Sequence, residues 1–303
     1  MRKTQSGWRR HWSRKWLRKF IAINLAVVTA SCGFACTWAA GPGKKTAKAK
    51  ATEKVARKTD DEGAKSLAKD LPKSVADNHP LKPLVAQAEA SLEAVATLKD
   101  YSTLLFKKEI VQTKLISQTL VTKIRHEPFS VYMKFEDPHA GREVIYVDGL
   151  NKGKLLAHEA GFRALAGTIT LLPTCKEALA ENRYPITQAG MAKMLEVVIG
   201  LWKADAQYQE VQVKQVAGMK VGEQVCVMLE TIHPQPRDHF KFHMTRLYIE
   251  TATKLPIRLE QYTWPEKEGG EAVLVEEYTY SQVQTNLGLT DLDFDKSNPA
   301  YKY

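Results

Sequence analysis

Two histidines are the first candidates for chemistry in this sequence. His239 and His243 are four residues apart, the spacing at which two imidazoles on one helix can bind the same metal ion. The intervening Phe-Lys-Phe has strand character, and residues four apart in a strand lie about 13 Å from each other. We therefore expect no metal ion shared by the two histidines.

Carboxylates near the C-terminus are the next candidates, for calcium binding or for acid–base work. Glu276 and Glu277 are adjacent, and adjacent side chains of a strand point to opposite faces of the sheet. The Asp-x-Asp-x-Asp run that begins at Asp291 spaces its oxygen donors as in a calcium loop, but the glycine and glutamate that complete such a loop are absent. We expect Asp291 to cap a turn and Phe294 to anchor the tail.

Other sequence signatures of catalysis are absent. The sequence has no Gly-rich phosphate loop, no His-Glu-x-x-His helix and no Gly-x-Ser-x-Gly elbow. We therefore predict no catalytic residue, no metal and no cofactor, and expect a protein that is not an enzyme.

Two of the four cysteines, Cys175 and Cys226, lie in the globular part of the sequence. In an oxidising compartment they could form a disulfide that closes a loop of about 50 residues and stabilises the fold by roughly 3–4 kcal/mol. The alternative is that Cys226, within Gln-Val-Cys-Val-Met-Leu, is a small buried hydrophobic residue of a strand. Both interpretations stay open.

The positive charge is concentrated near the N-terminus. The chain of 303 residues has a net charge of +10, but residues 1–79 hold 18 of the 44 Lys and Arg and only 6 of the 34 Asp and Glu. That region therefore carries a net charge of +12, and the remainder carries −2. A nearly neutral globular part argues against nucleic acid as a partner.

Residues 1–39 have the features of an export signal or membrane anchor. Eight Lys or Arg and no acid precede an apolar run at residues 20–30. Three endings stay open: a lipobox that leaves lipidated Cys32 at the new N-terminus, ordinary cleavage after Ala39, or an uncut anchor over residues 20–40. We predict an exported, periplasmic protein that is either soluble or anchored at its N-terminus.

Residues 40–78 are predicted to form a disordered linker. They are rich in Lys and Ala and contain almost no large apolar side chain, so they cannot bury enough surface to offset the entropy of ordering. We interpret them as a tether; the alternative is a polybasic arm attracted to anionic lipid headgroups of a membrane surface or to cell-wall polymers, with nucleic acid a weaker candidate. The globular domain is predicted at residues 79–303.

Short alternating segments predict the elements of this domain. Helical spacing of apolar residues runs from Leu81 to Leu98 and again from Thr187 to Trp202. Strand patterns occur at residues 101–111, 115–125, 129–135, 142–148, 154–159, 209–216, 223–232, 240–251, 256–262 and 272–283. Short connections between them favour antiparallel pairing. The expected fold is α+β: a curved antiparallel sheet, an unclosed β-barrel, of about ten strands wrapped around two or three helices.

Bulky apolar side chains on this sheet offer a candidate ligand site. The candidate lining residues are Phe129, Met133, Phe240 and Phe242, with Trp202 on the apolar helix above them. Together they could enclose a cavity for acyl chains or an apolar peptide. The alternative is that the same residues pack sheet against helix, because periodicity does not distinguish a filled core from a hollow one.

Two long motifs resemble a known family. The run Pro-Phe-Ser-Val-Tyr-Met-Lys-Phe-Glu-Asp-Pro-His-Ala-Gly-Arg-Glu-Val-Ile-Tyr-Val-Asp-Gly at 128–149, with Glu-Glu-Tyr-Thr-Tyr at 276–280, is similar to an exported bacterial domain of unknown function. More distantly, the order of a helix, a strand pair, Pro-Phe-x₄-Lys-Phe and Tyr-Val-Asp-Gly resembles the lipoprotein carriers LolA and LolB and the RseB-like sensors. The resemblance implies an apolar hollow that receives acyl chains, with Arg142 as a counterpart of the carriers' arginine by position.

Two functions follow as expectations. The first is a non-enzymatic cell-envelope protein that binds an acyl chain, a lipoprotein or another apolar ligand in the hollow of the sheet. The second is a membrane-tethered structural or regulatory module that binds another envelope protein and has no ligand cavity.

Overall fold

The structure, a computed structural model, describes residues 74–267 and 269–303. Its helices and strands are α3 (Lys82–Ala96), β1 (Asp100–Val111), β2 (Lys114–Arg125), β3 (Ser130–Asp137), β4 (Glu143–Val147), β5 (Leu155–His158), β6 (Thr168–Leu171), α4 (Met191–Asp205), β7 (Gln212–Val221), β8 (Gln224–Ile232), β9 (Met244–Glu250), β10 (Pro256–Thr263) and β11 (Val273–Thr285). Short 3₁₀ helices are η1 (Asn151–Gly153), η2 (Gly161–Ala166), η3 (Ile186–Gln188) and η4 (Asp291–Phe294). The predicted signal and Cys32 lie outside the described residues.

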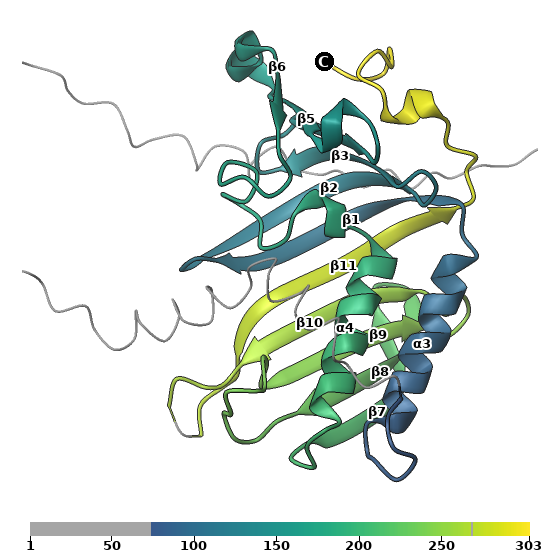
Figure 1. Ribbon diagram of the computed structural model, residues 1–303, viewed down its shortest axis with the longest axis vertical. Coiled ribbons are helices and arrows are strands. Elements are labelled where there is room, and N and C mark those ends of the chain that lie inside the picture. The colour runs from purple at the N-terminus through teal and green to yellow at the C-terminus, as the bar shows by residue number, and fades with distance from the viewer. Residues whose placement is uncertain (1–73, 268) are drawn as a thin grey trace, which may run out of the picture. The chain divides into compact units, whose positions relative to one another are not determined.

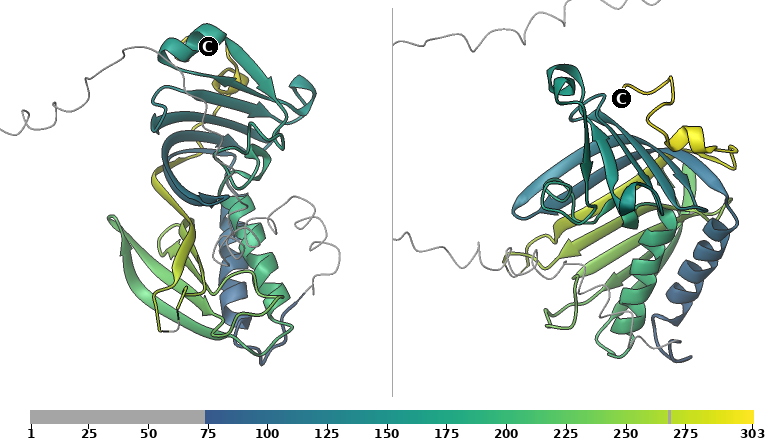
Figure 2. Two further views of the ribbon diagram at one scale, coloured as in Figure 1. Left: turned by 90° about the vertical axis from the view of Figure 1, so that its left-hand side faces the viewer. Right: turned by 45° about the horizontal axis from the view of Figure 1, so that its top comes forward.

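The strands of this part of the chain form one antiparallel sheet of eleven, in the order β6-β5-β4-β3-β2-β1-β11-β10-β9-β8-β7. Strands β1 to β6 and β7 to β11 are two meanders, which meet where the long strand β1 pairs with β11 (Figure 1). The sheet is curved and does not close (Figure 2). The predicted α+β class with an unclosed antiparallel sheet is confirmed, with eleven strands where about ten were expected.

The additional strand is β6, at one edge of the sheet. It has only four residues and follows directly on η2, with Gly167 between them in a left-handed conformation (φ +69°). Alternation over four residues does not by itself distinguish a strand from a loop, and β6 lacks the glycine-flanked hairpin turn at residues 149–153 that indicated the equally short β5. The pattern therefore predicted no strand there.

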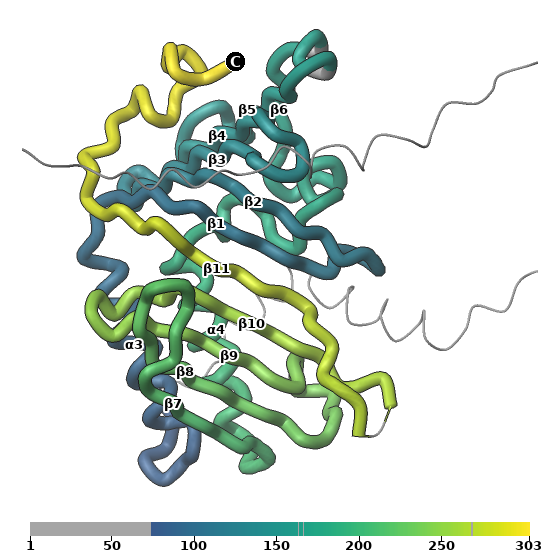
Figure 3. Tube along the Cα trace, turned by 180° about the vertical axis from the view of Figure 1, so that it is seen from behind, coloured from purple at the N-terminus to yellow at the C-terminus, as the bar shows by residue number. Residues whose placement is uncertain are grey.

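Two helices, α3 and α4, lie on the same face of the sheet and pack against each other (Figures 1 and 3). Helix α4 begins at Met191 and not at Thr187, because Gly190 before it has a φ of +102°. A Cβ at Gly190 would lie 2.8 Å from the hydroxyl of Tyr101, which accepts a hydrogen bond from the backbone N–H of Met191 (2.9 Å). The start of α4 is thereby fixed against β1.

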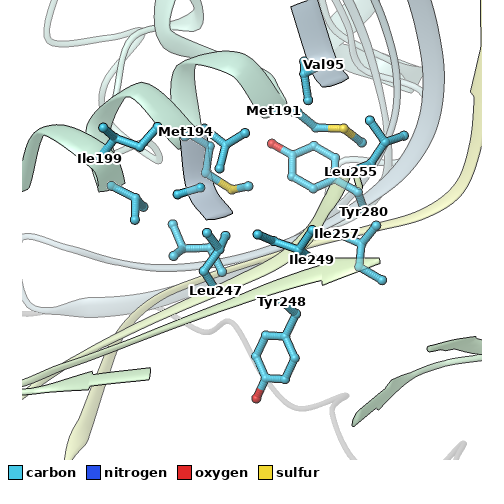
Figure 4. Close-up of a cluster of buried hydrophobic side chains, with 14 of the residues drawn as sticks. Val95, Met191, Met194, Ile199, Leu247, Tyr248, Ile249, Leu255, Ile257 and Tyr280 are labelled. Carbon is cyan, nitrogen blue, oxygen red and sulfur yellow. The ribbon is translucent and has the colours of Figure 1, made fainter. Parts of the chain in front are cut away.

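The main core lies between these helices and the sheet. Leu247, Ile249, Ile257 and Tyr280 point from the strands toward the helices, whereas Tyr248 points to the other face of the sheet (Figure 4). This alternation follows from the two-residue period of a strand. Trp202 of α4, with 1% of its surface exposed, belongs to the same core.

Phe240 was wrongly predicted to begin a strand, since β9 begins only at Met244. Its ring stacks on His233 with ring centroids 3.8 Å apart, and its backbone N–H donates to the carbonyl of Arg237 in a turn. His239 stacks on Tyr208 and the ring of His243 contacts the carbonyl oxygen of His233 (2.9 Å), so these two histidines have separate partners in a loop.

Two features are absent from the part of the chain that the structure describes. Over residues 74–303, with residue 268 left out, no three or more His, Cys, Asp or Glu side chains are grouped so that they could hold a metal ion. In the same residues no helix is long and apolar enough to cross a membrane.

The C-terminal tail packs on the face of the sheet away from the helices. Phe294 is buried against Tyr132, Ile145 and Val147, as its expected role of anchor requires. Asp291 pairs with Arg125 (2.7 Å) and does not cap the turn; Thr290 and Asp293 form the capping box of η4. The expectation for Asp291 was wrong because Thr290, the residue before it, is the N-cap, and Asp293 at the third position of the turn completes the capping box.

Tyr301 gives a first test of this tail. Its ring stacks on Tyr132 with centroids 4.1 Å apart and an interplanar angle of 8°, and its hydroxyl donates to the carbonyl of Asp293 (2.6 Å). Aromatic pairs stabilise by about 0.5–1.5 kcal/mol beyond the area that they bury. We expect Tyr301→Leu to lower the free energy of unfolding by about 1 kcal/mol in urea titrations, while Tyr303→Leu, which keeps this pair, has a smaller effect.

Candidate functional site

A cavity of about 370 Å³ lies between the helix-covered face of the sheet, the N-terminal part of α4 and the segment 172–190 that connects β6 to α4. Strand parity determines which side chains line it. On β1 the lining residues are Leu105, Lys107 and Glu109, and on β2 they are Leu120, Thr122 and Ile124. Every second residue faces the cavity, as the pleat of a strand dictates.

Strand register carries this lining across the sheet. Thr122, Met133, Val144, Ala157 and Ile169 are successive Cα partners on β2 to β6, and all five line the cavity. A second row is formed in the same way by Tyr280, Leu105, Leu120 and Phe135. These two rows form a largely apolar floor.

The segment 172–190 forms the opposite wall and will be called the cover segment. Its outer attachment is Glu181, which accepts a hydrogen bond from Arg142 (3.0 Å) and contacts His139 (3.1 Å). Arg142 also pairs with Glu159, the residue directly after β5 (2.8 Å). Burial opposes ionisation of Glu181, but the bonds from Arg142 and His139 lower its pKa below the usual value.

Removing Arg142 should loosen the cover segment. Partly exposed ion pairs contribute about 0.2–1 kcal/mol, so we expect Arg142→Gln to increase amide hydrogen exchange at residues 177–189 by up to about fivefold at neutral pH. In the unaltered protein the contribution of Glu181 is present above the ordinary pKa of glutamate and is lost as the pH falls through the lowered value. Lys134→Gln, which removes a surface pair with Glu136 at 3.4 Å, is the control and should leave this exchange unchanged.

Three consecutive residues of the cover segment attach it to the polar part of the lining. Asn182 accepts a hydrogen bond from Lys107 (2.6 Å). The backbone N–H of Arg183 donates to Glu109 (3.0 Å), and its side chain pairs with Glu276 (2.8 Å). The hydroxyl of Tyr184 lies 3.1 Å from both carboxylate oxygens of Glu276. These contacts hold the cover segment against β1 and β11.

The charges of this group are almost fully buried. Side-chain exposure is 3% for Arg183 and 2% for Glu276. Burial raises the pKa of the Glu276 carboxyl, and the guanidinium of Arg183 opposes that shift. Burial also lowers the pKa of the nearby Lys241 amine. We refer to Lys107, Glu109, Arg183 and Glu276 as the buried ion cluster.

Glu277 lies on the other face of the sheet, as expected for the neighbour of Glu276 in a strand. It pairs with Lys108 (3.3 Å) and with Arg258 (3.0 Å), neither of which lines the cavity. The two glutamates therefore serve separate sites, and the parity argument for them is confirmed.

The structure places only two of the six candidate residues in the cavity lining, Met133 and Arg142. Arg142 is engaged by two carboxylates there. Phe129 is half-buried, with its ring 6.3 Å from that of Tyr146, and Trp202 is part of the core. Phe240 and Phe242 are buried away from the lining.

Much of the lining was not predicted, although part of its signal was present. The alternation of side chains along β1, β2 and β4 places Leu105, Leu120 and Val144 on the face of the sheet that carries Met133. Extending that face from β3 to these strands would have indicated all three residues. The cover segment has no periodic pattern that could have indicated its place.

Cys175 and Cys226 are free thiols in the structure. Cys226 is buried in β8, whereas Cys175 lies half-buried in the cover segment. The structure thus contains no Cys175–Cys226 disulfide, and Cys226 is a small buried residue of a strand.

Comparisons with known proteins identify a family. The family described as a protein of unknown function, DUF1571, matches residues 98–303. No curated protein matches the chain. Similar solved structures include lipoprotein LppX of Mycobacterium tuberculosis, with 12% identity over 70% of this chain and 98% of that chain at a TM-score of 0.41. LprF from Mycobacterium bovis has 12% identity over 72% and 97% at a TM-score of 0.39. A LolA superfamily protein from Nitrosomonas europaea has 11% identity over 69% and 97% at 0.26.

Proposed function

Because the chain belongs to the DUF1571 family of proteins of unknown function, we propose its function from the cavity: the domain binds an acyl chain or another slender apolar ligand without transforming it. The observation that carries this proposal is the pair of apolar rows described above. A volume of about 370 Å³ is near the lower end of the roughly 300–1,000 Å³ typical of small-molecule sites.

The chemistry of the lining supports an apolar ligand. Leu105, Leu120, Phe135, Val144 and Leu155 offer surfaces that water wets poorly, so filling the space with methylene groups gains about 0.8 kcal/mol for each group buried. Most charged residues of the lining already have ion-pair partners: Arg142 pairs with Glu159 and Glu181, Lys107 with Glu109, and Glu276 with Arg183 behind the lining. A hydrocarbon ligand would leave these pairs intact.

The proposal also places the domain in the cell envelope. Residues 1–39 would act as a signal peptide or membrane anchor, residues 40–78 as a linker, and residues 79–303 as the binding domain. The ligand would then be a free lipid or the acyl groups of a lipoprotein, and an envelope protein would be a further partner.

Titration with parinaric acid, a fluorescent acyl chain, tests the proposal on the full-length protein. We expect saturable binding with one site per chain and displacement of the probe by palmitate. A signal that rises without saturation, or that palmitate does not reverse, would contradict a defined apolar site. It would favour the structural or regulatory module instead.

A further inference from the structure

The connection between β5 and β6 exposes two large apolar side chains. Phe162 and Leu165 of η2 have 86% and 82% of their surface exposed. They are three residues apart, and side chains at that spacing lie on the same side of a 3₁₀ helix. The connection projects from the end of the sheet (Figure 1). It forms what we call the apolar tip, defined by Phe162 and Leu165.

The apolar tip belongs to the same hairpin that lines the cavity. On its two strands the cavity-facing residues are Leu155 and Ala157 of β5 and Ile169 and Leu171 of β6. Ile169 is itself 42% exposed, and Leu172 after β6 is 52% exposed. Apolar surface therefore runs along this hairpin from the tip to the cavity lining, at a strand that is the edge of the sheet.

We propose that the apolar tip docks on a lipid bilayer by inserting Phe162 and Leu165 into its interface. A projecting turn with two apolar side chains on the same side can insert into the hydrocarbon region of a bilayer. The free energy gained is proportional to the apolar area that insertion removes from water. The sequence favours the same occupant, because an apolar run at residues 20–30 and a linker of residues 40–78 would keep the domain within reach of a membrane. This inference concerns a second surface, and its failure would leave the proposed cavity binding untouched.

A fluorophore at the tip provides the test. The full chain, with its four cysteines replaced by alanine, carries either Leu165→Cys or Leu115→Cys labelled with nitrobenzoxadiazole. Leu115 is the control because it is also largely exposed, at 56%, but lies at the start of β2 away from the tip. Vesicles of phosphatidylcholine have no net charge, so the lysine-rich residues add no electrostatic attraction to them.

The label at 165 should shift its emission to shorter wavelength on addition of vesicles and should be quenched by brominated acyl chains. The label at 115 should do neither. Phe162→Asp should abolish the response at 165, whereas Phe162→Leu should keep most of it. Both changes are at an exposed side chain, so circular dichroism should confirm an unaltered fold. No response at 165, an equal response at 115, or indifference to Phe162→Asp would each overturn the proposal.

Discussion

Replacing Arg183 by methionine is expected to destabilise the protein by about 3–5 kcal/mol at neutral pH, which is the largest single effect that the structure predicts. The change leaves the Glu276 carboxylate, 2% exposed, without its ion-pair partner at 2.8 Å. Breaking a buried pair in this way has a large cost because an uncompensated charge remains in a medium that solvates it poorly. Urea unfolding monitored by tryptophan fluorescence gives the free energy.

The same variant predicts a direction for the pH dependence. Burial already raises the pKa of Glu276, and loss of the opposing Arg183 raises it further. A carboxyl whose pKa is higher in the folded state binds its proton more readily there, so its cost falls as the pH is lowered toward that pKa. We expect the difference between variant and unaltered protein to be smaller at pH 5 than at pH 7.5.

A double variant separates the buried charge from lost packing. Arg183→Met combined with Glu276→Gln removes both charges, so the double variant should recover part of the stability that Arg183→Met loses. Its difference in free energy of unfolding from the unaltered protein should no longer depend on pH in the way that the single variant's does. A cost below about 1 kcal/mol for Arg183→Met, or a gap that does not change with pH, would contradict a buried ionised pair at this position.

Filling the cavity should weaken binding of the apolar ligand strongly. Ala157 lies in the middle of the hairpin that lines the cavity, and Ala157→Trp puts an indole into the space beside Val144 and Ile169. Displacing two methylene groups of a ligand costs about 1.6 kcal/mol, so we expect the dissociation constant for parinaric acid to rise at least about tenfold.

Leu156→Trp is the matched control for this variant. Leu156 is the neighbour of Ala157 on β5 and points to the other face of the sheet, where it contacts the C-terminal tail. The same indole on the wrong face should leave the dissociation constant within about twofold, given that large substitutions at packed sites affect mainly stability, by about 1–3 kcal/mol. Equal losses in both variants would mean that binding does not take place in the cavity.

The architecture was largely predictable because it depends on local pattern. Alternation of apolar and polar residues identifies ten of the eleven strands, since one face of each strand is buried. The same parity explains why Glu276 and Glu277 separate to opposite faces. The role of Phe294 as the anchor of the tail was also predictable, because a large apolar side chain among polar neighbours is expected to be buried.

The cavity was less predictable because it depends on packing between distant segments. The alternating segment that contains Phe240 and Phe242 has the pattern of a strand. Phe240 nevertheless lies in a loop before β9, where its ring stacks on His233. Trp202 has the size of a lining residue but fills the core. The attachment of the cover segment through Arg183 and Tyr184 joins positions about 90 residues apart in sequence, and no periodic signal reports such a contact.

Native mass spectrometry of the full-length protein, purified under mild conditions from the cells that produce it, tests the central claim most directly. The account predicts a population heavier than the bare chain by the mass of one lipid or acyl group, present in the unaltered protein and in Leu156→Trp and lost in Ala157→Trp. If the unaltered protein appears only at the mass of the bare chain, even after incubation with lipid extract, the proposal that the cavity holds an apolar ligand is wrong.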